Sequence, residues 1–453
     1  MLLRNMLHLN TFLVSILIFL LNSISYFILA NSYVLPTPVF ELLEPKGIRI
    51  WIPNEQGLKF FAFQGNINKK LKLNQLGEIS GEVYRKENEK WTIENRNINI
   101  VSGDIIHYWI YIQVNEAMHI SGEQTWTVAI TNKFMNLLFH ETFDSLKNSV
   151  WNHEVKIPLT PDYEFCVYHN DQHSSIYVEN GLLKIKPLIL ENLYGENATT
   201  YGKLILSGCT SKISEECERK GKSFHILPPI LSARLNTKNT FSFQYGKIEI
   251  RAKFPNGDWL YPEMWLQPKY DYYGPNYSSG CVILGLSRGN ENLISTDGKI
   301  YDSRTLDFGL RIGTTKNLTN YIVSQTLEDG PRWTKDFHTY TTIWDSSGFQ
   351  FFVDGKEFGK LIPQENGWMY GNNFSKMAPF DQQFYITLGI GVGGIRVFPD
   401  GTTSSGNVKP WKNVGAKAML QFWHAKDQWL SSWRRTNSEE NIFEIDYIRI
   451  WSL

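Results

Sequence analysis

Cysteine is scarce in this chain, which has 4 cysteines among 453 residues. This scarcity excludes a small scaffold held together by disulfides, because such scaffolds place several bridges in fewer than about 100 residues. Cys209 and Cys217 bracket a polar loop, and we expect them to form a disulfide. Cys166 and Cys281 are expected to be free buried thiols, although the sequence leaves a second bridge between them open.

An excess of one charge is also missing, since 45 Lys and Arg stand against 45 Asp and Glu. A net charge of zero does not suggest a general attraction to nucleic acids or anionic membranes, so we expect no nucleic-acid partner. His, Cys, Asp and Glu do not cluster at metal-ligand spacings, so we expect no metal and no cofactor. The length of the chain allows two or three domains with substantial cores.

Long apolar runs are absent outside the N-terminus. There, basic Arg4 precedes the apolar stretch Phe12–Leu21, which is the pattern of a secretory signal peptide, expected over residues 1–30. A signal anchor is the alternative, because apolar residues resume at Tyr26–Ala30, but the polar residues from Asn22 to Ser25 interrupt the run. We therefore expect a secreted, extracellular protein without a membrane span after cleavage. Four glycosylation sequons agree with secretion, at Asn197, Asn276, Asn317 and Asn373.

Aromatic residues, by contrast, are abundant: they make up 14% of the chain and include 15 Trp and 22 Tyr. Sugar rings stack their C–H faces on aromatic planes, so this abundance points weakly to carbohydrate binding. Large β-sandwich cores are the alternative explanation.

The first region, residues 31–131, contains short β-rich runs and no convincing amphipathic helix. The run Ile105–Val114 alternates between two faces. The face expected to be the core carries Ile106, Tyr108, Ile110, Ile112 and Val114. The other face carries Ile105, His107, Trp109, Tyr111 and Gln113. Trp109 and Tyr111 lie side by side there and could form a platform for a sugar.

The second region, residues 135–453, is again rich in short strands with Gly and Asn turns, and no Pro/Ser/Thr-rich linker precedes it. We expect strand-forming segments at Leu138–Phe143, Ile176–Ile185, Phe241–Phe254, Thr339–Trp344, Phe349–Val353 and Phe443–Trp451. Many antiparallel strands imply a two-sheet jelly roll. The expected fold is all-β, an immunoglobulin-like β-sandwich followed by a β-jelly-roll of the concanavalin-like type.

The first region resembles the N-terminal glucan-binding module of carbohydrate-binding family thirty-nine. The matching segments are Pro45–Arg49, Phe61–Gly65, Trp91–Ile93 and Tyr108–Tyr111. In that family a Trp of the last segment and an acidic residue contact the glucan, and the resemblance places these contacts on Trp109 and Glu82. This chain departs from the family at Ile79 and Gly81, where the family has Trp and Arg, and at Ile120, which aligns with a further family Arg. The resemblance implies glucan binding, with an affinity or preferred glucan that can differ.

The stretch Phe254–Asn290 resembles the catalytic strand of the β-1,3-glucanase branch of glycoside hydrolase family sixteen. That strand reads Glu-x-Asp-x-x-Glu between a Ser-Gly and a Ser-Arg-Gly-Asn-like ending. Here both flanks are present, but the three acidic positions hold Cys281, Ile283 and Leu286. A retaining glycosidase needs two carboxyl groups about 5 Å apart. A strand supplies them on one face at positions two apart, and a bulge can return a residue five positions on to that face. Because a thiol is mostly protonated at neutral pH and Ile and Leu carry no titratable proton, we expect no hydrolysis by this strand.

The same family resemblance extends over the second region, through Ala233–Lys238, Tyr245–Lys253, Tyr261–Leu266 and Phe443–Tyr447. In the family's cleft Trp residues flank the catalytic strand, and the matching positions are Trp265 and Trp411. Core packing is the alternative for both, and it is the favoured one for Trp265. A calcium site on the jelly roll would follow from family analogy only.

Together the two resemblances imply an arthropod recognition protein of the β-1,3-glucan-binding and Gram-negative-bacteria-binding type. Its expected partners are β-1,3-glucan, or a related microbial cell-wall polysaccharide, and the serine proteases of an immune cascade. One alternative is an active secreted endo-β-1,3-glucanase that uses Glu263 or Glu291 instead of the altered strand. Another is a module that binds a different protein or a different microbial polymer.

Overall fold

The computed structural model describes residues 33–43, 47–73, 75–98, 100, 103–128, 136–170, 175–314, 316–369, 374–434 and 440–453. The expected signal peptide, residues 1–30, and the sequon at Asn373 lie outside these residues. The chain divides into two compact units, residues 1–133 and residues 134–453, and each is described by itself. Within the described ranges, no helix combines the length and apolar character needed to cross a bilayer.

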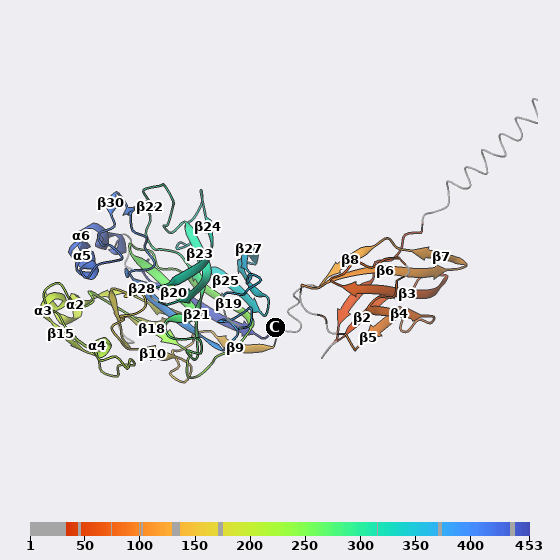
Figure 1. Cartoon of the computed structure of the whole chain (residues 1–453), viewed down its shortest axis with the longest axis horizontal. Coiled ribbons are helices and arrows are strands. Elements are labelled where there is room, and N and C mark those ends of the chain that lie inside the picture. Colours follow the sequence, from red (N-terminus) through yellow and green to blue (C-terminus); the bar gives the residue numbers. More distant parts are fainter. Residues whose placement is uncertain are drawn as a thin grey trace, which may run out of the picture. The chain divides into compact units, whose positions relative to one another are not determined.

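Two antiparallel sheets make up the first unit (Figure 1). The smaller sheet has the order β1 (Val39–Leu42), β2 (Ile48–Pro53) and β5 (Lys90–Asn95). The larger sheet has the order β4 (Ile79–Val83), β3 (Leu58–Ile67), β6 (Ile105–Val114) and β7 (Ala117–Ile120), and β8 (Gln124–Thr127) also pairs with β6.

Alternate residues of facing strands fill the space between these sheets, because successive side chains of a strand point to opposite faces. β2 buries Ile48, Ile50 and Ile52, and β6 buries Ile106, Tyr108, Ile110 and Ile112. These side chains belong to one apolar cluster. Burial of each contributes about 1.5–3 kcal/mol of transfer free energy. The predicted sandwich and the predicted core face of β6 are thus confirmed, with Val114 only partly buried at the end of the strand.

The second unit contains two large antiparallel sheets (Figure 1). The seven-stranded sheet has the order β10 (Asn152–Glu154), β18 (Arg234–Asn236), β28 (Phe384–Val392), β20 (Leu260–Pro268), β21 (Tyr277–Leu286), β23 (Thr305–Gly313) and β24 (Leu318–Thr326). The eight-stranded sheet has the order β12 (Ile176–Glu179), β13 (Leu182–Ile185), β31 (Phe443–Trp451), β19 (Gly246–Lys253), β25 (His338–Asp345), β26 (Gly348–Val353) and β27 (Lys356–Leu361), with β9 (Leu137–Glu141) paired to β31. This is the predicted jelly roll.

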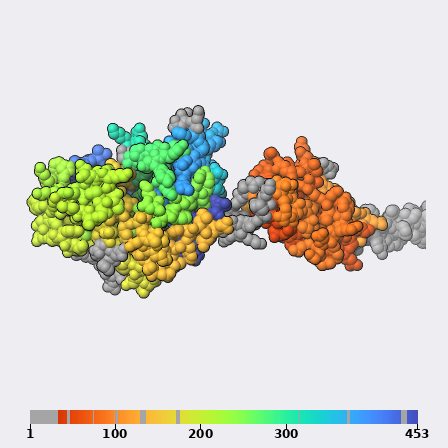
Figure 2. All heavy atoms as spheres, turned by 90° about the horizontal axis from the view of Figure 1, so that it is seen from below, coloured from red at the N-terminus to blue at the C-terminus, as the bar shows by residue number. Residues whose placement is uncertain are grey.

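Aromatic rings from the two large sheets meet in the core of the second unit. Phe308 of β23 stacks on Phe351 of β26, with ring centroids 5.0 Å apart. Because strand residues alternate in direction, the neighbours of Phe308 at positions 307 and 309 face the opposite side of the seven-stranded sheet. The cavity of the second unit that is described below lies on that opposite side. Figure 2 shows the outer surface of each unit from one side.

Smaller elements complete the second unit. The short strands are β11 (Cys166–Tyr168), β14 (Leu188–Ile189), β15 (Lys203–Ile205), β16 (Glu218–Lys220), β17 (Ile230–Ser232), β22 (Leu293–Ser295), β29 (Thr402–Ser404) and β30 (Asn407–Val408). The helices are α2 (Leu190–Tyr194), α3 (Ala198–Tyr201), α4 (Ser214–Cys217), α5 (Ala418–His424), α6 (Lys426–Trp429) and the 3₁₀ helix η2 (Leu430–Arg434). Cys209 and Cys217 form the predicted disulfide, and Cys166 and Cys281 are free and buried.

The predicted strand over Phe241–Phe254 is wrong at its beginning. β19 starts only at Gly246, because Tyr245 has a φ of 61° and Gly246 a φ of 159°, and the first of these leaves the extended region. Phe243 pairs instead with Phe384 in an isolated bridge. By contrast, β6 and β31 have the bounds that the alternation of apolar residues predicts.

Candidate functional site

The outward face of the larger sheet in the first unit carries the predicted glucan contacts. Directly opposed residues of neighbouring strands point to the same side of a sheet. Glu82 of β4 pairs with Ala62 of β3, Ala62 pairs with Tyr111 of β6, and Tyr111 pairs with Ile120 of β7. Strands lie about 4.8 Å apart, so this row of four residues spans roughly 14 Å across the sheet. We call this surface, together with Trp109, the β6 face.

Trp109 lies in the adjoining row of the β6 face, paired with Gln64, which in turn pairs with Ser80. Its ring is half-buried, and its Nε1–H donates a hydrogen bond to the carbonyl oxygen of Leu71 at 3.0 Å. A Trp with its one donor satisfied presents a fixed apolar plane, which is the geometry that sugar stacking needs. The structure therefore places Trp109, Tyr111 and Glu82 on one face.

Two of the departures from the family lie on the other side of β4. Ile79 is fully buried in the core of the first unit. Gly81 pairs with Phe63, and a Cβ atom at Gly81 would come within 2.4 Å of Ile93 Cγ2. Both positions face inward, so their change does not alter the β6 face. Ile120 is the departure that does lie on this face, where it is 46% exposed.

In the second unit, strand β21 carries the three positions where the family has acids. Ile283 pairs with Gly309 and Leu286 with Asp307, with a shift of register between them that marks the expected bulge. Gly285, inside the bulge, has a φ of 147°. Cys281 is almost completely buried, and burial raises the pKa of its thiol to about 12, so the thiol is uncharged at neutral pH.

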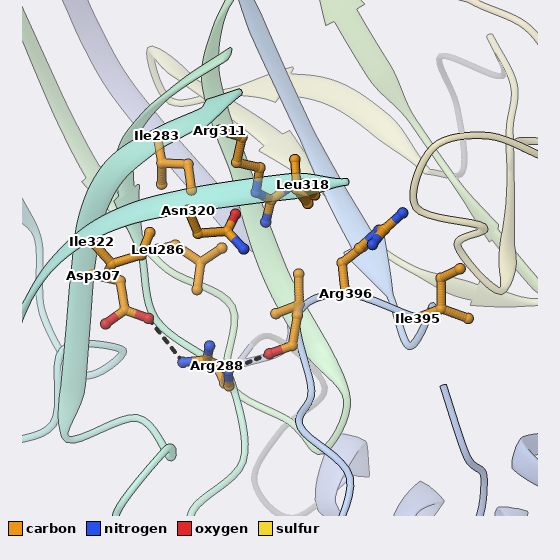
Figure 3. Close-up of a pocket in the computed structure, with 11 residues that line it drawn as sticks. Ile283, Leu286, Arg288, Asp307, Arg311, Leu318, Asn320, Ile322, Ile395 and Arg396 are labelled. Carbon is orange, nitrogen blue, oxygen red and sulfur yellow. Dashed lines mark hydrogen bonds and ion pairs between the residues drawn. The ribbon is translucent and has the colours of Figure 1, made fainter. Parts of the chain in front are cut away.

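A cavity of about 290 Å³ opens over Ile283 and Leu286 (Figure 3). Its lining comes from β21 and the turn after it (Ile283, Leu286, Arg288), from β23 (Asp307, Arg311), from β24 (Leu318, Asn320, Ile322) and from the loop after β28 (Ile395, Arg396, Val397). We call it the β21 cavity. Neither Glu263 nor Glu291, the acids of the alternative glucanase hypothesis, is part of this lining.

Three arginines surround the β21 cavity, and each is paired with an aspartate. Arg288 donates from Nη1 to Asp307 Oδ2 at 3.0 Å (Figure 3). Arg311 donates from Nη1 to Asp162 Oδ2 at 2.8 Å, and Arg396 Nε lies 3.7 Å from Asp162 Oδ1. Arg288 and Arg311 are 8% and 5% exposed, so both charges lie within the protein.

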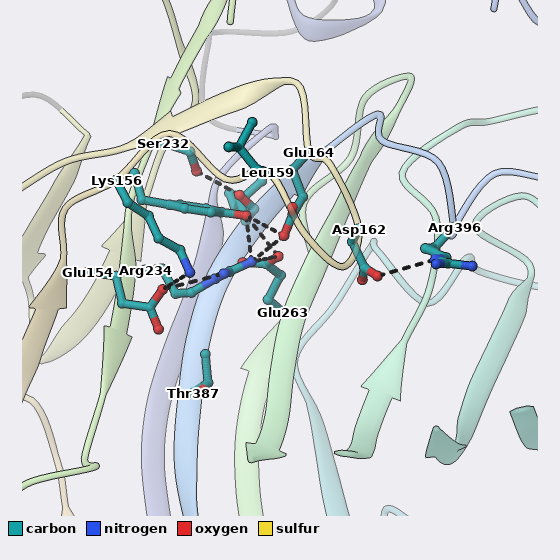
Figure 4. Close-up of polar contacts among 12 residues, drawn as sticks. Glu154, Lys156, Leu159, Asp162, Glu164, Ser232, Arg234, Glu263, Thr387 and Arg396 are labelled. Atoms are coloured by element: carbon teal, nitrogen blue, oxygen red, sulfur yellow. Dashed lines mark hydrogen bonds and ion pairs between the residues drawn. The ribbon is translucent and has the colours of Figure 1, made fainter. Parts of the chain in front are cut away.

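A second charged network surrounds Arg234 of β18, with partners from β10, from β20 and from β11 and the loop before it (Figure 4). Arg234 donates from Nε to Glu263 Oε2 at 2.8 Å and from Nη2 to Glu164 Oε1 at 2.6 Å, and its Nη1 reaches Glu154 at 3.5 Å. The Tyr168 hydroxyl donates to Glu263 Oε1 at 2.9 Å. Glu263 has no exposed surface, so these bonds hold it away from any ligand in solvent.

The carboxyls of this network titrate in opposite directions. Burial raises the pKa of Glu263 to about 7, against the lowering effect of the Arg234 charge. Burial also acts to raise the pKa of Glu164, but the nearby Arg234 charge and its hydrogen bond outweigh burial and lower it. Arg234 and Lys156 bring two positive charges to three carboxylates, and the most buried of the three, Glu263, retains its proton most readily.

Trp265 and Trp411 are core residues. Core packing is the alternative that the sequence favours for Trp265, whereas for Trp411 the structure corrects the prediction that the ring stacks on a sugar. The two residues are 1% and 2% exposed, so neither ring offers a face to a ligand. The Trp265 ring lies between two guanidinium groups, 5.6 Å from that of Arg234 and 5.3 Å from that of Arg311. Trp411 donates from Nε1 to the carbonyl oxygen of Gly394 at 2.9 Å.

The arginines of the β21 cavity are the functional candidates that sequence reasoning missed. Arg288 was visible within the Ser-Arg-Gly-Asn ending, but no motif marks Arg311 or Arg396, which come from separate strands and loops. Within the described ranges, no group of three or more His, Cys, Asp and Glu residues could hold a metal ion.

Two family models match this chain. One, described as a carbohydrate binding domain (CBM39, family 32), matches residues 34–154. The other, glycosyl hydrolases family 16, matches residues 313–410.

Similar proteins extend over nearly the whole chain. The β-1,3-glucan-binding protein of Tenebrio molitor is 30% identical over 486 residues, covering 93% of this chain and 97% of that protein. The β-1,3-glucan-binding protein of Hyphantria cunea is 31% identical over 491 residues, covering 96% of this chain and 98% of that protein. Gram-negative bacteria-binding protein 1 of Drosophila melanogaster is 31% identical over 490 residues, covering 93% and 96%.

Solved structures of laminarinases are similar to part of this chain at lower identity. The catalytic domain of the endo-1,3-β-glucanase from Thermotoga petrophila RKU-1 has a TM-score of 0.45 and 22% identity, covering 70% of this chain and 98% of that one. The laminarinase from Rhodothermus marinus has a TM-score of 0.45 and 18% identity, covering 70% and 97%.

Proposed function

This chain belongs to the family of β-1,3-glucan-binding and Gram-negative bacteria-binding proteins, and on that premise we propose that it is a pattern-recognition protein for microbial β-1,3-glucan. It binds the polysaccharide through the β6 face and does not hydrolyse it. It is secreted, and the bound form activates the serine proteases of an immune cascade.

The observation that carries the proposal is the composition of the β6 face. Tyr111 and Glu82 lie in one row across the sheet, and Trp109 lies in the adjoining row with its donor already satisfied. An aromatic plane stacks on the C–H face of a sugar ring, and a carboxylate accepts hydrogen bonds from its hydroxyls. Several rings of a polymer can lie along a row that spans roughly 14 Å.

The side chains on β21 support the proposed absence of hydrolysis. The three positions that would hold the acids of a glycosidase carry Cys281, Ile283 and Leu286, and the thiol is uncharged at neutral pH. Retaining and inverting glycosidases each need a pair of carboxyls, at about 5 Å or at a wider spacing, and β21 supplies neither member of such a pair. The alternative glucanase that uses Glu263 is disfavoured, because Arg234 and Tyr168 hold this carboxyl in the interior.

Secretion is supported by three features of the chain. The expected signal peptide occupies residues 1–30, and Cys209 and Cys217 form a disulfide, which persists in oxidising compartments. The sequons at Asn197, Asn276 and Asn317 are exposed, as glycosylation requires.

The test is a pull-down of the full chain on insoluble β-1,3-glucan, with an assay for released reducing ends in the same tubes. Trp109→Ala is expected to weaken binding about fivefold, as loss of ~1 kcal/mol of stacking predicts, and Trp109→Phe to retain most of it. Trp51→Ala is the matched control, because Trp51 lies half-buried on β2 of the other sheet.

Wild type that stays in the supernatant would refute glucan recognition. Equal loss in Trp109→Ala and Trp51→Ala would refute the β6 face as its site. Release of reducing ends by wild type would refute the proposed lack of hydrolysis.

A further inference from the structure

Positive charge exceeds negative charge around the β21 cavity. Arg288, Arg311 and Arg396 contribute three cationic groups, whereas Asp307 and Asp162 contribute two carboxylates. Because two of these arginines are more than nine-tenths buried, solvent screens their charges less than it would at the surface. The charged groups at the cavity therefore sum to one excess positive charge.

The residues at the three altered positions decide whether positive or negative charge is in excess at the cavity. With acids at positions 281, 283 and 286, carboxylates would outnumber the arginines, and the region would repel anions. With Cys281, Ile283 and Leu286, three negative charges are missing while the arginines remain. The change that removes the acids thus also makes the cavity attractive to anions.

The buried guanidinium groups retain hydrogen-bond donors for a ligand. Among the described residues, Arg311 donates through Nη1 to Asp162 and Tyr277, and Arg288 donates through Nη1 to Asp307 and through Nε to the Val397 carbonyl. A guanidinium carries five N–H donors in a planar fork that matches the oxygens of a carboxylate or phosphate. These contacts engage only part of that fork in each arginine.

The remaining lining suits a sugar ring next to the anion. Ile283 and Leu286 form an apolar surface of the cavity, which a C–H face of a ring can cover, and Asn320 of β24 offers an amide to hydroxyl groups (Figure 3). A volume of about 290 Å³ is near the lower end of the roughly 300–1,000 Å³ range of small-molecule sites, which fits one substituted ring rather than a long chain.

We propose that the β21 cavity binds an anionic substituent, a carboxylate or a phosphate ester, carried by a sugar of a microbial polysaccharide. This site is separate from the β6 face in sequence and composition, and the proposal does not depend on the glucan contacts of that face. It gives the second unit a ligand preference of its own, for charged rather than neutral saccharides.

The experiment compares three probes with one backbone on the full chain by isothermal titration calorimetry. They are laminarihexaose, the same oligosaccharide with C6 oxidised to carboxylates, and the same oligosaccharide with C6 phosphate esters. Wild type is expected to bind at least one charged probe more tightly than the neutral one, and the stronger of the two identifies the source of the anion.

Ile283→Asp tests whether this preference comes from the β21 cavity. Position 283 pairs with Gly309, two residues from Arg311 along β23, so a new carboxylate there would compete with the ligand for Arg311. The preference for the charged probe is expected to fall roughly tenfold or more. Ile283→Asn is the matched control, because it removes the same apolar side chain without adding charge, and it is expected to keep the preference.

A second variant, Arg396→Gln, removes one cationic group of the lining whose side chain is 21% exposed. Arg396→Gln is expected to reduce the preference for the charged probe roughly threefold. If neither variant at position 283 folds, this variant alone tests whether the anion binds in the β21 cavity. Equal binding of charged and neutral probes by wild type would overturn the proposal. So would a preference that Ile283→Asp and Arg396→Gln leave unchanged, since the anion would then bind elsewhere.

Discussion

Replacement of Glu263 by glutamine is expected to remove a pH dependence from the stability of the second unit. Burial raises the pKa of Glu263 from 4.5 to about 7. The folded state therefore holds this proton more tightly than the unfolded chain does. The stabilising contribution is fully present below about pH 4.5, and it is lost progressively as the pH rises to about 7.

The size of the effect follows from the shift. A change of one pKa unit corresponds to 1.36 kcal/mol, so the shift of Glu263 is worth on the order of 3 kcal/mol. Roughly 2–3 kcal/mol of this falls between pH 5 and pH 8. The side chain has no exposed surface, so solvent does not screen the effect. A glutamine at this position stays neutral, keeps nearly the same volume, and leaves Arg234 with Glu164 and Glu154 as partners.

The assay is urea unfolding of the full chain from pH 5 to pH 8, followed by Trp fluorescence. The transition of the first unit, which the substitution does not touch, serves as the internal reference. Wild type is expected to lose stability in the second unit across this range, and Glu263→Gln to lose roughly 2–3 kcal/mol less.

Glu164→Gln is the matched control, because Glu164 pairs with the same arginine but has a lowered pKa. A lowered pKa stabilises the folded state above the unfolded pKa, so this variant is expected to be less stable than wild type at neutral pH. The difference is expected to shrink as the pH falls. If Glu263→Gln and wild type lose stability in parallel between pH 5 and pH 8, Glu263 does not hold a proton in the folded state.

Two further predictions concern a glycine and the disulfide of the second unit. Gly285→Ala is expected to lower the free energy of unfolding in urea by about 2 kcal/mol, because the φ of Gly285 is 147° and a Cβ there would lie 2.9 Å from Met264 Cε. Gly415→Ala is the control: a Cβ there meets no atom within 4 Å, so the free energy of unfolding is expected to change little. An unchanged urea midpoint in Gly285→Ala would show that an alanine fits this backbone conformation without strain. Cys209→Ser is expected to lower stability by about 2.5 kcal/mol, because the disulfide to Cys217, eight residues on, no longer restricts the unfolded chain. Cys217→Ser should match it in thermal unfolding, and a reductant should then have no additional effect; two different losses would argue against a shared bridge.

Sequence reasoning succeeded where the pattern of apolar residues was regular. The alternation over Ile105–Val114 predicted both faces of β6, and the alternation over Phe443–Trp451 predicted β31. The bulge in β21 was expected from motif spacing, and the register shift between Ile283 and Leu286 confirms it. Each of these signals depends on neighbours along the chain.

Sequence reasoning failed where distant segments decide the environment of a residue. Trp411 packs against Phe165 and Trp259, which lie 246 and 152 residues before it, so no local pattern distinguishes this ring from an exposed one. The β21 cavity has the same origin, since Arg288, Arg311 and Arg396 meet only after β21, β23 and the loop after β28 are in place. The start of β19 was missed because a left-handed φ at Tyr245 leaves no clear mark in the sequence.

Strand β24 ends the seven-stranded sheet and has consequences for handling the protein in solution. Among the described strands it has one ladder partner, β23, so one row of its backbone N–H and C=O groups lies at a sheet edge. Long edge strands with apolar side chains template the association of molecules edge to edge, and β24 is nine residues long with Ile322 exposed. The exposed sequon at Asn317 stands directly before this strand. A glycan there would shield the edge, so a host that does not glycosylate would deliver a chain with this aggregation-prone edge bare.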